Sequence, residues 1–258
     1  MKKWGLLFLS LLLSGGCSAT EAMKMENIPL RQIGLPSRLI IDQDFIPRDW
    51  NVVAFGDSLT EGVGDRDHQG GYVFDLKEKL LHNKGVRSVT VTNLGKRGLR
   101  LSQLQDVIQS HEQEIREADM VLITIGGNDI MKVVRSHLFD LTYDLFEKNQ
   151  KSFAAKLDRL MQSLRALNPH ATIVLVGVYN PFSSPLQDVP EIDEVIDMWN
   201  RGSQAVLSKY DRAIFVDVKD LFDNRDDLLY DDQFHPNELG YEKIAERVYE
   251  HLLGSMKQ

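Results

Sequence analysis

The sequence predicts an α/β fold in which helices cover both faces of one parallel sheet. Short runs rich in Val and Ile alternate along the chain with longer segments whose apolar residues recur at helical spacing. Two of the short runs, 120–125 and 172–176, are almost wholly apolar, which is typical of strands buried on both faces. The length of 258 residues, with 43% hydrophobic and 26% charged residues, suits a single globular domain.

Each element follows from its own pattern of side chains. The strands are expected where β-branched or continuous apolar residues occur, at 50–55, 86–94, 120–125, 172–176 and 213–216. The helical segments repeat apolar residues every three or four positions, at 72–81, 101–118, 130–167, 190–209 and 237–253. We expect the long segment 130–167 to form two helices. Ligands of such folds bind at the carboxyl ends of the strands, so the loops that follow the strands hold the candidate site.

The first 16 residues have the layout of a secretory signal peptide. Lys2 and Lys3 precede an apolar run of ten residues, and small residues follow it. The run is too short to span a bilayer, which needs about 20 residues. We therefore expect residues 1–16 to be a signal peptide and the protein to be extracytoplasmic.

Cys17 follows these small residues directly, an arrangement that resembles the lipobox of bacterial lipoproteins. The position three residues before it holds Ser14 rather than an apolar residue, which leaves ordinary secretory cleavage after Ala19 as the alternative. We predict that Cys17 carries a lipid anchor to the membrane. Residues 17–49, polar and interrupted by prolines, then form a tether, and residues 50–258 form the folded domain.

Charge and cysteine content exclude several classes of protein. The net charge is −8, which makes nucleic acid an improbable partner. Cys17 is the only cysteine, so the sequence has no internal disulfide framework and no Cys-based zinc site. His111 and Glu112 lack the second histidine of a zinc-protease motif. We expect neither a metal ion nor a cofactor.

Ser58 is the first candidate catalytic residue. It lies in Gly56-Asp57-Ser58-Leu59, just after the first predicted strand. A glycine at a strand end permits a tight turn, and Ser58 then falls at a helix N-terminus, where free N–H groups can stabilise an oxyanion. A serine needs a neighbouring base to act as a nucleophile. The alternative role of Ser58 is that of a simple helix cap.

Asp232 and His235 form a D-x-x-H pattern near the end of the chain. A carboxylate three residues before a histidine can turn back and hold its Nδ1–H, which leaves Nε2 free to face a nucleophile. The alternative is an ordinary solvated acidic loop, because Asp226, Asp227 and Asp231 lie close by.

Two further loops offer groups that suit an oxyanion hole. Gly98 closes the stretch 93–98 after the second strand, and Asn128 follows two glycines after the third strand. An Asn amide is a suitable oxyanion donor, and a glycine lets its backbone N–H approach a substrate closely. Each loop alone is also consistent with ordinary turn chemistry.

In this order, Ser58, Gly98, Asn128 and His235 resemble the four motif blocks of the GDSL (SGNH) hydrolase family of esterases and lipases. The resemblance extends from residue 51 to about residue 253. It implies a three-layer α/β/α sandwich around a five-stranded parallel sheet with a flavodoxin-like strand order. In the second block, residues 93–98, either Gly98 or Gly95 could match the family's glycine, and we choose Gly98.

The resemblance also implies a serine esterase mechanism. His235 would remove the proton of Ser58, which attacks the ester carbonyl, while Asp232 orients His235. The backbone N–H groups of Ser58 and Gly98 and the side chain of Asn128 would hold the oxyanion.

The loop 179–186, after the fourth strand, is the candidate for a substrate pocket. Tyr179 and Phe182 are expected to contact an acyl chain, or alternatively to pack on their own domain. The expected substrate is a small ester, a lipid or an acylated glycan. Two alternatives remain open from the sequence: an O-acetylesterase acting on carbohydrate or cell wall, and a binding lipoprotein without turnover.

Overall fold

The computed structural model describes residues 46–66 and 70–256. The predicted signal peptide, Cys17 and nearly all of the predicted tether lie outside these residues. Every element described below belongs to the unit Asp42–Gln258.

The sheet has five parallel strands in the order β2-β1-β3-β4-β5. The strands are β1 (Arg48–Gly56), β2 (Val86–Gly95), β3 (Met120–Thr124), β4 (Thr172–Val176) and β5 (Ala213–Val216). The five-stranded parallel sheet and its flavodoxin-like order are therefore confirmed.

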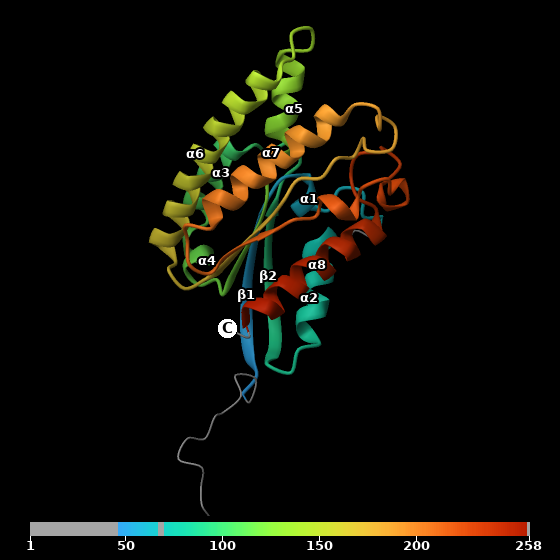
Figure 1. The fold of residues 1–258 in the computed structure, drawn as a ribbon. Coiled ribbons are helices and arrows are strands. Elements are labelled where there is room, and N and C mark those ends of the chain that lie inside the picture. The colour runs from blue at the N-terminus through green and yellow to red at the C-terminus, as the bar shows by residue number, and fades with distance from the viewer. Residues whose placement is uncertain (1–45, 67–69, 257–258) are drawn as a thin grey trace, which may run out of the picture. The chain divides into compact units, whose positions relative to one another are not determined.

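The helices lie on the two faces of this sheet (Figure 1). They are α1 (Ser58–Glu61), α2 (Gly71–Leu81), α3 (Leu101–Ser110), α4 (Glu112–Arg116), α5 (Gly127–Ser136), α6 (Tyr143–Leu167), α7 (Pro190–Leu207) and α8 (Glu238–Met256), with short 3₁₀ turns η1 (Lys219–Leu221) and η2 (Asp226–Leu228). One face is covered by α2 and α8, and the other by α3 to α7. The predicted three-layer α/β/α sandwich is confirmed.

Alternation along the strands builds the two apolar layers. Val53 and Phe55 of β1 belong to the cluster under α3 to α7, whereas Val52 and Ala54 belong to the cluster under α2 and α8. Successive side chains of a strand point to opposite faces, so a continuous apolar run supplies both layers.

The predicted helix 101–118 is wrong in one respect, because it consists of two helices. His111 leaves the helical conformation with φ −132° and ends α3 before α4 begins. Leu104, Ile108 and Ile115 all remain buried on the same face across this break, so the apolar spacing does not reveal it. The segment 130–167 does form two helices, α5 and α6, as predicted.

The strand register places the candidate loops together. Gly56 at the end of β1 lies beside Gly95 of β2 on one side and Thr124 of β3 on the other, and Thr124 lies beside Val176 of β4. The carboxyl ends of these strands are therefore level, and the loops that follow them meet at one edge. In the part of the chain that the structure describes, no helix is long and apolar enough to cross a membrane.

Candidate active site

Ser58 is the first residue of α1, a helix of only four residues. Asp57 occupies the cap position, where its side chain accepts a hydrogen bond from the N–H of Leu59 at 3.1 Å. The alternative role of Ser58 as the helix cap is therefore wrong. With capping done by its neighbour, the hydroxyl of Ser58 is free to contact another group.

Asp57 is held in place from the adjacent strand. Its Oδ1 accepts a hydrogen bond from the Thr124 hydroxyl at 2.8 Å, and its N–H donates to the Thr124 carbonyl at 3.0 Å. Gly56 permits this approach, because a Cβ there would collide with Thr124. Burial raises the pKa of Asp57 to about 6, although the hydrogen bonds from Thr124 and Leu59 oppose that rise.

The loop before α8 folds back on itself to present His235. Its Asp232 carboxylate accepts hydrogen bonds from the N–H groups of Phe234 at 3.0 Å and His235 at 2.9 Å. The N–H of Tyr230 donates to the His235 carbonyl at 2.7 Å, which closes the loop. These bonds fix the backbone conformation at His235.

Ser58, His235 and Asp232 form a continuous chain of polar contacts. His235 Nε2 lies 2.9 Å from Ser58 Oγ, and His235 Nδ1 lies 2.6 Å from Asp232 Oδ2. Ser58 and His235 are each only 5% exposed. Partial burial works against the charged form of Asp232, but the hydrogen bonds from His235 and Phe234 outweigh it and hold the pKa of that carboxyl below its usual value.

The two predicted oxyanion loops lie beside Ser58. Gly98, Asn128 and Ser58 line one open cleft of about 790 Å³, together with Asp232 and His235. The Asn128 amide donates one hydrogen bond to the Leu99 carbonyl at 3.0 Å, which orients it and leaves its second N–H available.

Gly95 and Gly98 have different surroundings. Gly98 has φ +84° and nothing within 4 Å of the position that a Cβ would occupy. Gly95 lies at the end of β2, where a Cβ would collide with the backbone of Thr60 and Glu61 in α1. Gly98 faces the cleft, whereas Gly95 allows α1 to pack closely on β2.

A second, apolar cavity of about 530 Å³ adjoins this cleft. Tyr179 and Phe182 both line it, as the sequence suggested for the loop after the fourth strand. Segment 130–134, which the sequence offers either as a second pocket wall or as a core-facing helix, lies in α5 and contributes Ile130, Met131 and Val134. The sequence did not point to the parts of α6 and α7 that complete the lining. These contributions are Tyr143, Phe146, Ile192, Val195 and Ile196.

Tyr179 also supports the histidine loop. Its hydroxyl donates to the carbonyl of Phe234 at 2.6 Å, and its ring stacks on Phe222 with centroids 3.9 Å apart. Phe182 packs at a tilt against Phe234, with centroids 6.0 Å apart. The wall of the apolar cavity is thus connected directly to the loop that carries His235.

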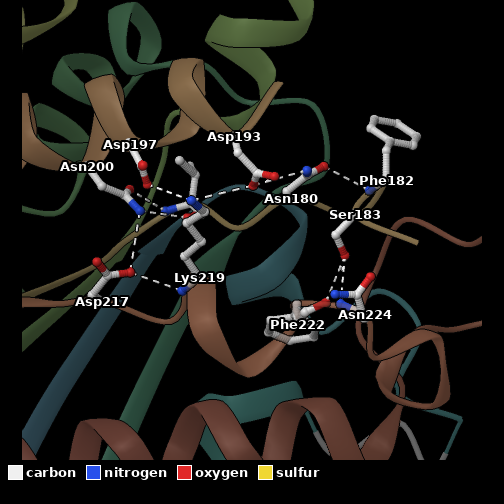
Figure 2. Close-up of polar contacts among 11 residues, drawn as sticks. Asn180, Phe182, Ser183, Asp193, Asp197, Asn200, Asp217, Lys219, Phe222 and Asn224 are labelled. Atoms are coloured by element: carbon white, nitrogen blue, oxygen red, sulfur yellow. Dashed lines mark hydrogen bonds and ion pairs between the residues drawn. The ribbon is translucent and has the colours of Figure 1, made fainter. Parts of the chain in front are cut away.

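Polar side chains hold the start of the segment between β4 and α7 (Figure 2). Asn200 of α7 accepts from the N–H of Val178 at 2.9 Å and donates to the Val178 carbonyl at 2.8 Å. Asn180 accepts from the N–H of Phe182 at 2.9 Å and donates to Asp193 at 3.3 Å. The backbone on either side of Tyr179 is therefore attached to α7.

Two further contacts attach this region to the segment after β5. Figure 2 shows Lys219 reaching α7, where its Nζ lies 2.7 Å from Asp197 and 3.4 Å from Asp193. The hydroxyl of Ser183 donates to the Phe222 carbonyl at 3.1 Å and accepts from the N–H of Asn224 at 3.0 Å. The cavity wall is thus attached to α7 and to the segment that follows β5.

Within residues 46–66 and 70–256, no group of three or more His, Cys, Asp or Glu side chains is arranged to hold a metal ion. The chemistry available at the site is that of a hydroxyl, an imidazole, a carboxylate and amide donors.

Known proteins resemble this chain over most of its length. Residues 54–243 match the profile of the GDSL-like Lipase/Acylhydrolase family. The chain is 37% identical over 204 residues to the uncharacterized protein YpmR of Bacillus subtilis (strain 168). The aligned region covers 77% of this chain and 80% of YpmR.

Two further similarities extend the comparison. The spore germination lipase LipC of Bacillus licheniformis is 26% identical over 205 residues, covering 76% of this chain and 92% of LipC. The crystal structure of the lipase Lip_vut3 from a goat rumen metagenome superposes with a TM-score of 0.70 at 23% identity, covering 78% of this chain and 96% of that one. The latter likeness supports the fold.

Proposed function

The chain belongs to the GDSL-like lipase/acylhydrolase family and is a serine hydrolase of carboxylic esters; from that premise we propose that Ser58 is its nucleophile. The observation that carries this proposal is the 2.9 Å contact between Ser58 Oγ and His235 Nε2, with Asp232 on the far nitrogen of the same ring. This arrangement activates a serine and orients its base.

The reaction follows from these positions. His235 takes the proton of Ser58 as its oxygen attacks the ester carbonyl, and the oxyanion is held by the N–H groups of Ser58 and Gly98 and by the Asn128 amide. His235 then donates the proton to the departing alcohol as the carbonyl–alcohol bond breaks. Water hydrolyses the acyl-enzyme by the same steps, and Asp232 stabilises the imidazolium in both halves.

The acyl group of the substrate is proposed to occupy the apolar cavity lined by Tyr179 and Phe182. Its volume of about 530 Å³ far exceeds the needs of an acetyl group, and its apolar lining offers an acyl chain a favourable transfer from water. A longer acyl chain is therefore favoured over acetate.

Hydrolysis of nitrophenyl esters from acetate to long-chain acyl tests both statements. We expect kcat/KM to rise with chain length beyond acetate, and Ser58→Ala to remove most of the turnover. Asn128→Ala is expected to lower kcat about 10²–10³-fold, because one oxyanion donor is lost. Undiminished hydrolysis by Ser58→Ala would refute the nucleophile assignment, and a preference for acetate would refute the assignment of the cavity.

We also propose that the protein is extracytoplasmic and attached to a membrane by a lipid on Cys17. The basic start, the short apolar run and the position of the only cysteine support this. Mass spectrometry of the membrane fraction should find the acylated cysteine at the mature N-terminus, and Cys17→Ser should release the protein from that fraction. An unmodified Cys17 in membrane-bound protein would contradict the proposal, and release of the wild type into the medium would favour simple secretion.

A further inference from the structure

Phe234, the residue directly before His235, borders three open spaces. It lines the apolar cavity, the cleft that contains Ser58, and a third, small cavity of about 50 Å³. Its side chain is only partly buried. Close packing holds a side chain in place, and a void on one side removes those contacts. Packing alone therefore gives little restraint to Phe234 and to the peptide group that joins it to His235.

The loop 230–236, which carries His235, also contains an unfavourable backbone conformation. Gln233 has φ +54°, in the left-handed region that residues with a Cβ rarely adopt. The hydrogen bonds to Asp232, and the bond between Tyr230 and the His235 carbonyl, join parts of the same loop. Such internal bonds set the shape of the loop but not its position relative to Ser58. That position depends on contacts with other elements.

Tyr179 makes such a contact at the peptide group next to His235. Its hydroxyl donates to the Phe234 carbonyl at 2.6 Å, across 55 positions of the chain. Arg66 contacts the loop nearer its start, through an exposed ion pair with Asp231 at 2.7 Å. An exposed ion pair contributes little to stability. The bond from Tyr179 is therefore well placed to hold the end of the loop at which His235 lies.

Tyr179 is itself held on several sides. Its ring stacks on Phe222 with centroids 3.9 Å apart, and the residue is only 8% exposed. The next residue, Asn180, donates to Asp193 of α7 at 3.3 Å (Figure 2). Burial raises the pKa of the Tyr179 phenol well above its usual value, so the hydroxyl remains a hydrogen-bond donor near neutral pH.

Tyr179 and Phe182 line the same cavity but differ in what they offer an acyl chain. Tyr179 has one face of its ring against Phe222, and its hydroxyl is bonded to the backbone. Phe182 is more exposed, and it reaches the loop of His235 only by a tilted ring contact with Phe234, with centroids 6.0 Å apart. Phe182 thus has more surface free for a substrate, and Tyr179 has the stronger connection to His235.

We propose that Tyr179 is a positioning residue, which holds His235 at Ser58 through the carbonyl of Phe234. The inference rests on the proposed function, because it takes His235 as the base that activates Ser58. A displacement of about 1 Å in a catalytic group can lower the rate about 10²-fold. Loss of the hydroxyl should therefore slow the chemical steps rather than weaken substrate binding.

The test uses Tyr179→Phe, which removes the hydroxyl and retains the ring. We measure kcat and KM with nitrophenyl acetate and nitrophenyl octanoate, and titration of Ser58 with a phosphonate gives the concentration of intact sites. We expect kcat to fall about tenfold for both esters. Because His235 acts in both acylation and deacylation, KM should stay within about twofold of the wild type.

Two further variants separate positioning from the other roles of an aromatic side chain. Phe182→Leu alters the cavity wall, so it should lower kcat/KM more for the octanoate than for the acetate. Tyr210→Phe is the matched control, because the Tyr210 hydroxyl also donates to a backbone carbonyl, that of Asp158 at 3.0 Å. Tyr210 lines neither the cavity nor the cleft, and its variant should retain the kcat of the wild type.

Proton NMR gives a readout that does not depend on turnover. The Nδ1 proton of His235, in its 2.6 Å contact with Asp232, should give a resonance far downfield. We expect Tyr179→Phe to shift or broaden this resonance, because the His235 backbone is no longer held from outside its loop. Tyr210→Phe should leave the resonance where it is in the wild type.

The outcomes distinguish this inference from the proposed function. An unchanged kcat in Tyr179→Phe, or a loss confined to the octanoate and expressed in KM, would overturn the positioning role and leave Tyr179 as part of the cavity wall. A downfield resonance identical to that of the wild type would also count against it. In each of these cases Ser58-dependent hydrolysis by the wild type keeps the serine hydrolase intact, whereas full hydrolysis by Ser58→Ala would overturn the proposed function itself.

Discussion

The glycines of the second motif block differ in what their missing side chains allow. At Gly98 the constraint is the backbone, because φ +84° is unfavourable for residues with a Cβ although space is open. At Gly95 the constraint is space, because α1 lies against it. One glycine therefore affects the direction of an N–H in the cleft, and the other affects helix packing.

Gly98→Ala and Gly95→Ala should accordingly fail in different ways. We expect Gly98→Ala to lower kcat while reducing the free energy of unfolding by about 1 kcal/mol. Gly95→Ala should reduce that free energy by about 2–3 kcal/mol, because the clash is with backbone atoms. Urea unfolding and ester kinetics on both variants measure this. A larger kcat loss in folded Gly95→Ala would exchange the two assignments.

Asp57 is a buried carboxyl group whose pKa lies at about 6, which makes folding depend on pH. Its folded pKa exceeds the unfolded value, so the native state binds the proton more tightly and stability falls as pH rises from about 4 to about 6. Relative to Asp57→Asn, the wild type should lose up to about 3 kcal/mol across that interval and show no further change above it. Urea titrations at several pH values measure the difference, and a constant difference would disprove the shift.

At the scale of elements, α7 organises the wall of the apolar cavity. Asn200 from this helix pairs with both backbone groups of Val178, and the side chain of Asn200 is buried. Helix α7 also contributes Ile192, Val195 and Ile196 to the cavity lining. The position of the cavity wall therefore depends on the contacts of Asn200 with Val178, which involve none of the catalytic residues.

Asn200→Ala should leave the N–H and carbonyl of Val178 without their partners. We expect a loss of about 2–4 kcal/mol in the free energy of unfolding. The exposed neighbour provides the control, because Arg201→Ala on the same helix should change stability by less than about 0.5 kcal/mol. Denaturant unfolding of both variants tests this, and equal stability of the two would show that Asn200 does not support the wall.

At the scale of the folded unit, one sheet separates two apolar clusters that share its strands. Leu157 of α6 is fully buried on one face, and Ile244 of α8 is fully buried on the other. The strands between them contribute alternate side chains to each cluster. Loss of packing on either face therefore lowers the stability of the same five strands.

Leu157→Ala and Ile244→Ala should each lower the free energy of unfolding by about 2–5 kcal/mol. Because both clusters rest on one sheet, far-ultraviolet and near-ultraviolet circular dichroism should give coincident transitions for each variant. Two separated transitions in either variant would show that the faces unfold independently.

Much of this arrangement was predictable because local patterns encode it. The strands 172–176 and 213–216 were predicted to the residue, since their apolar runs end abruptly. Ser58 and His235 were identifiable from their short motifs, and the parallel sheet required their loops to lie at one edge. The cap formed by Asp57 was missed, because Ser and Asp are equally good helix caps in sequence.

The cavities were less predictable, for a physical reason. Residues such as Val195 line the apolar cavity with the same spacing and the same apolar character as residues that only fill the core. Arg97 and Arg135 both line the cleft beside Ser58 although they are 38 positions apart, and their convergence depends on the strand order rather than on either local pattern. Sequence periodicity shows which face of a helix is buried. It does not show whether that face packs against other side chains or lines a cavity.

The contact between Ser58 and His235 joins residues 177 positions apart in the chain. A ribosome adds about 5–20 residues per second, so Ser58 is synthesised roughly 10–35 s before its base exists. During that interval the serine is an ordinary alcohol with no means of losing its proton. The nascent chain therefore cannot hydrolyse esters through Ser58. Hydrolysis becomes possible only after the loop that carries His235 has been synthesised.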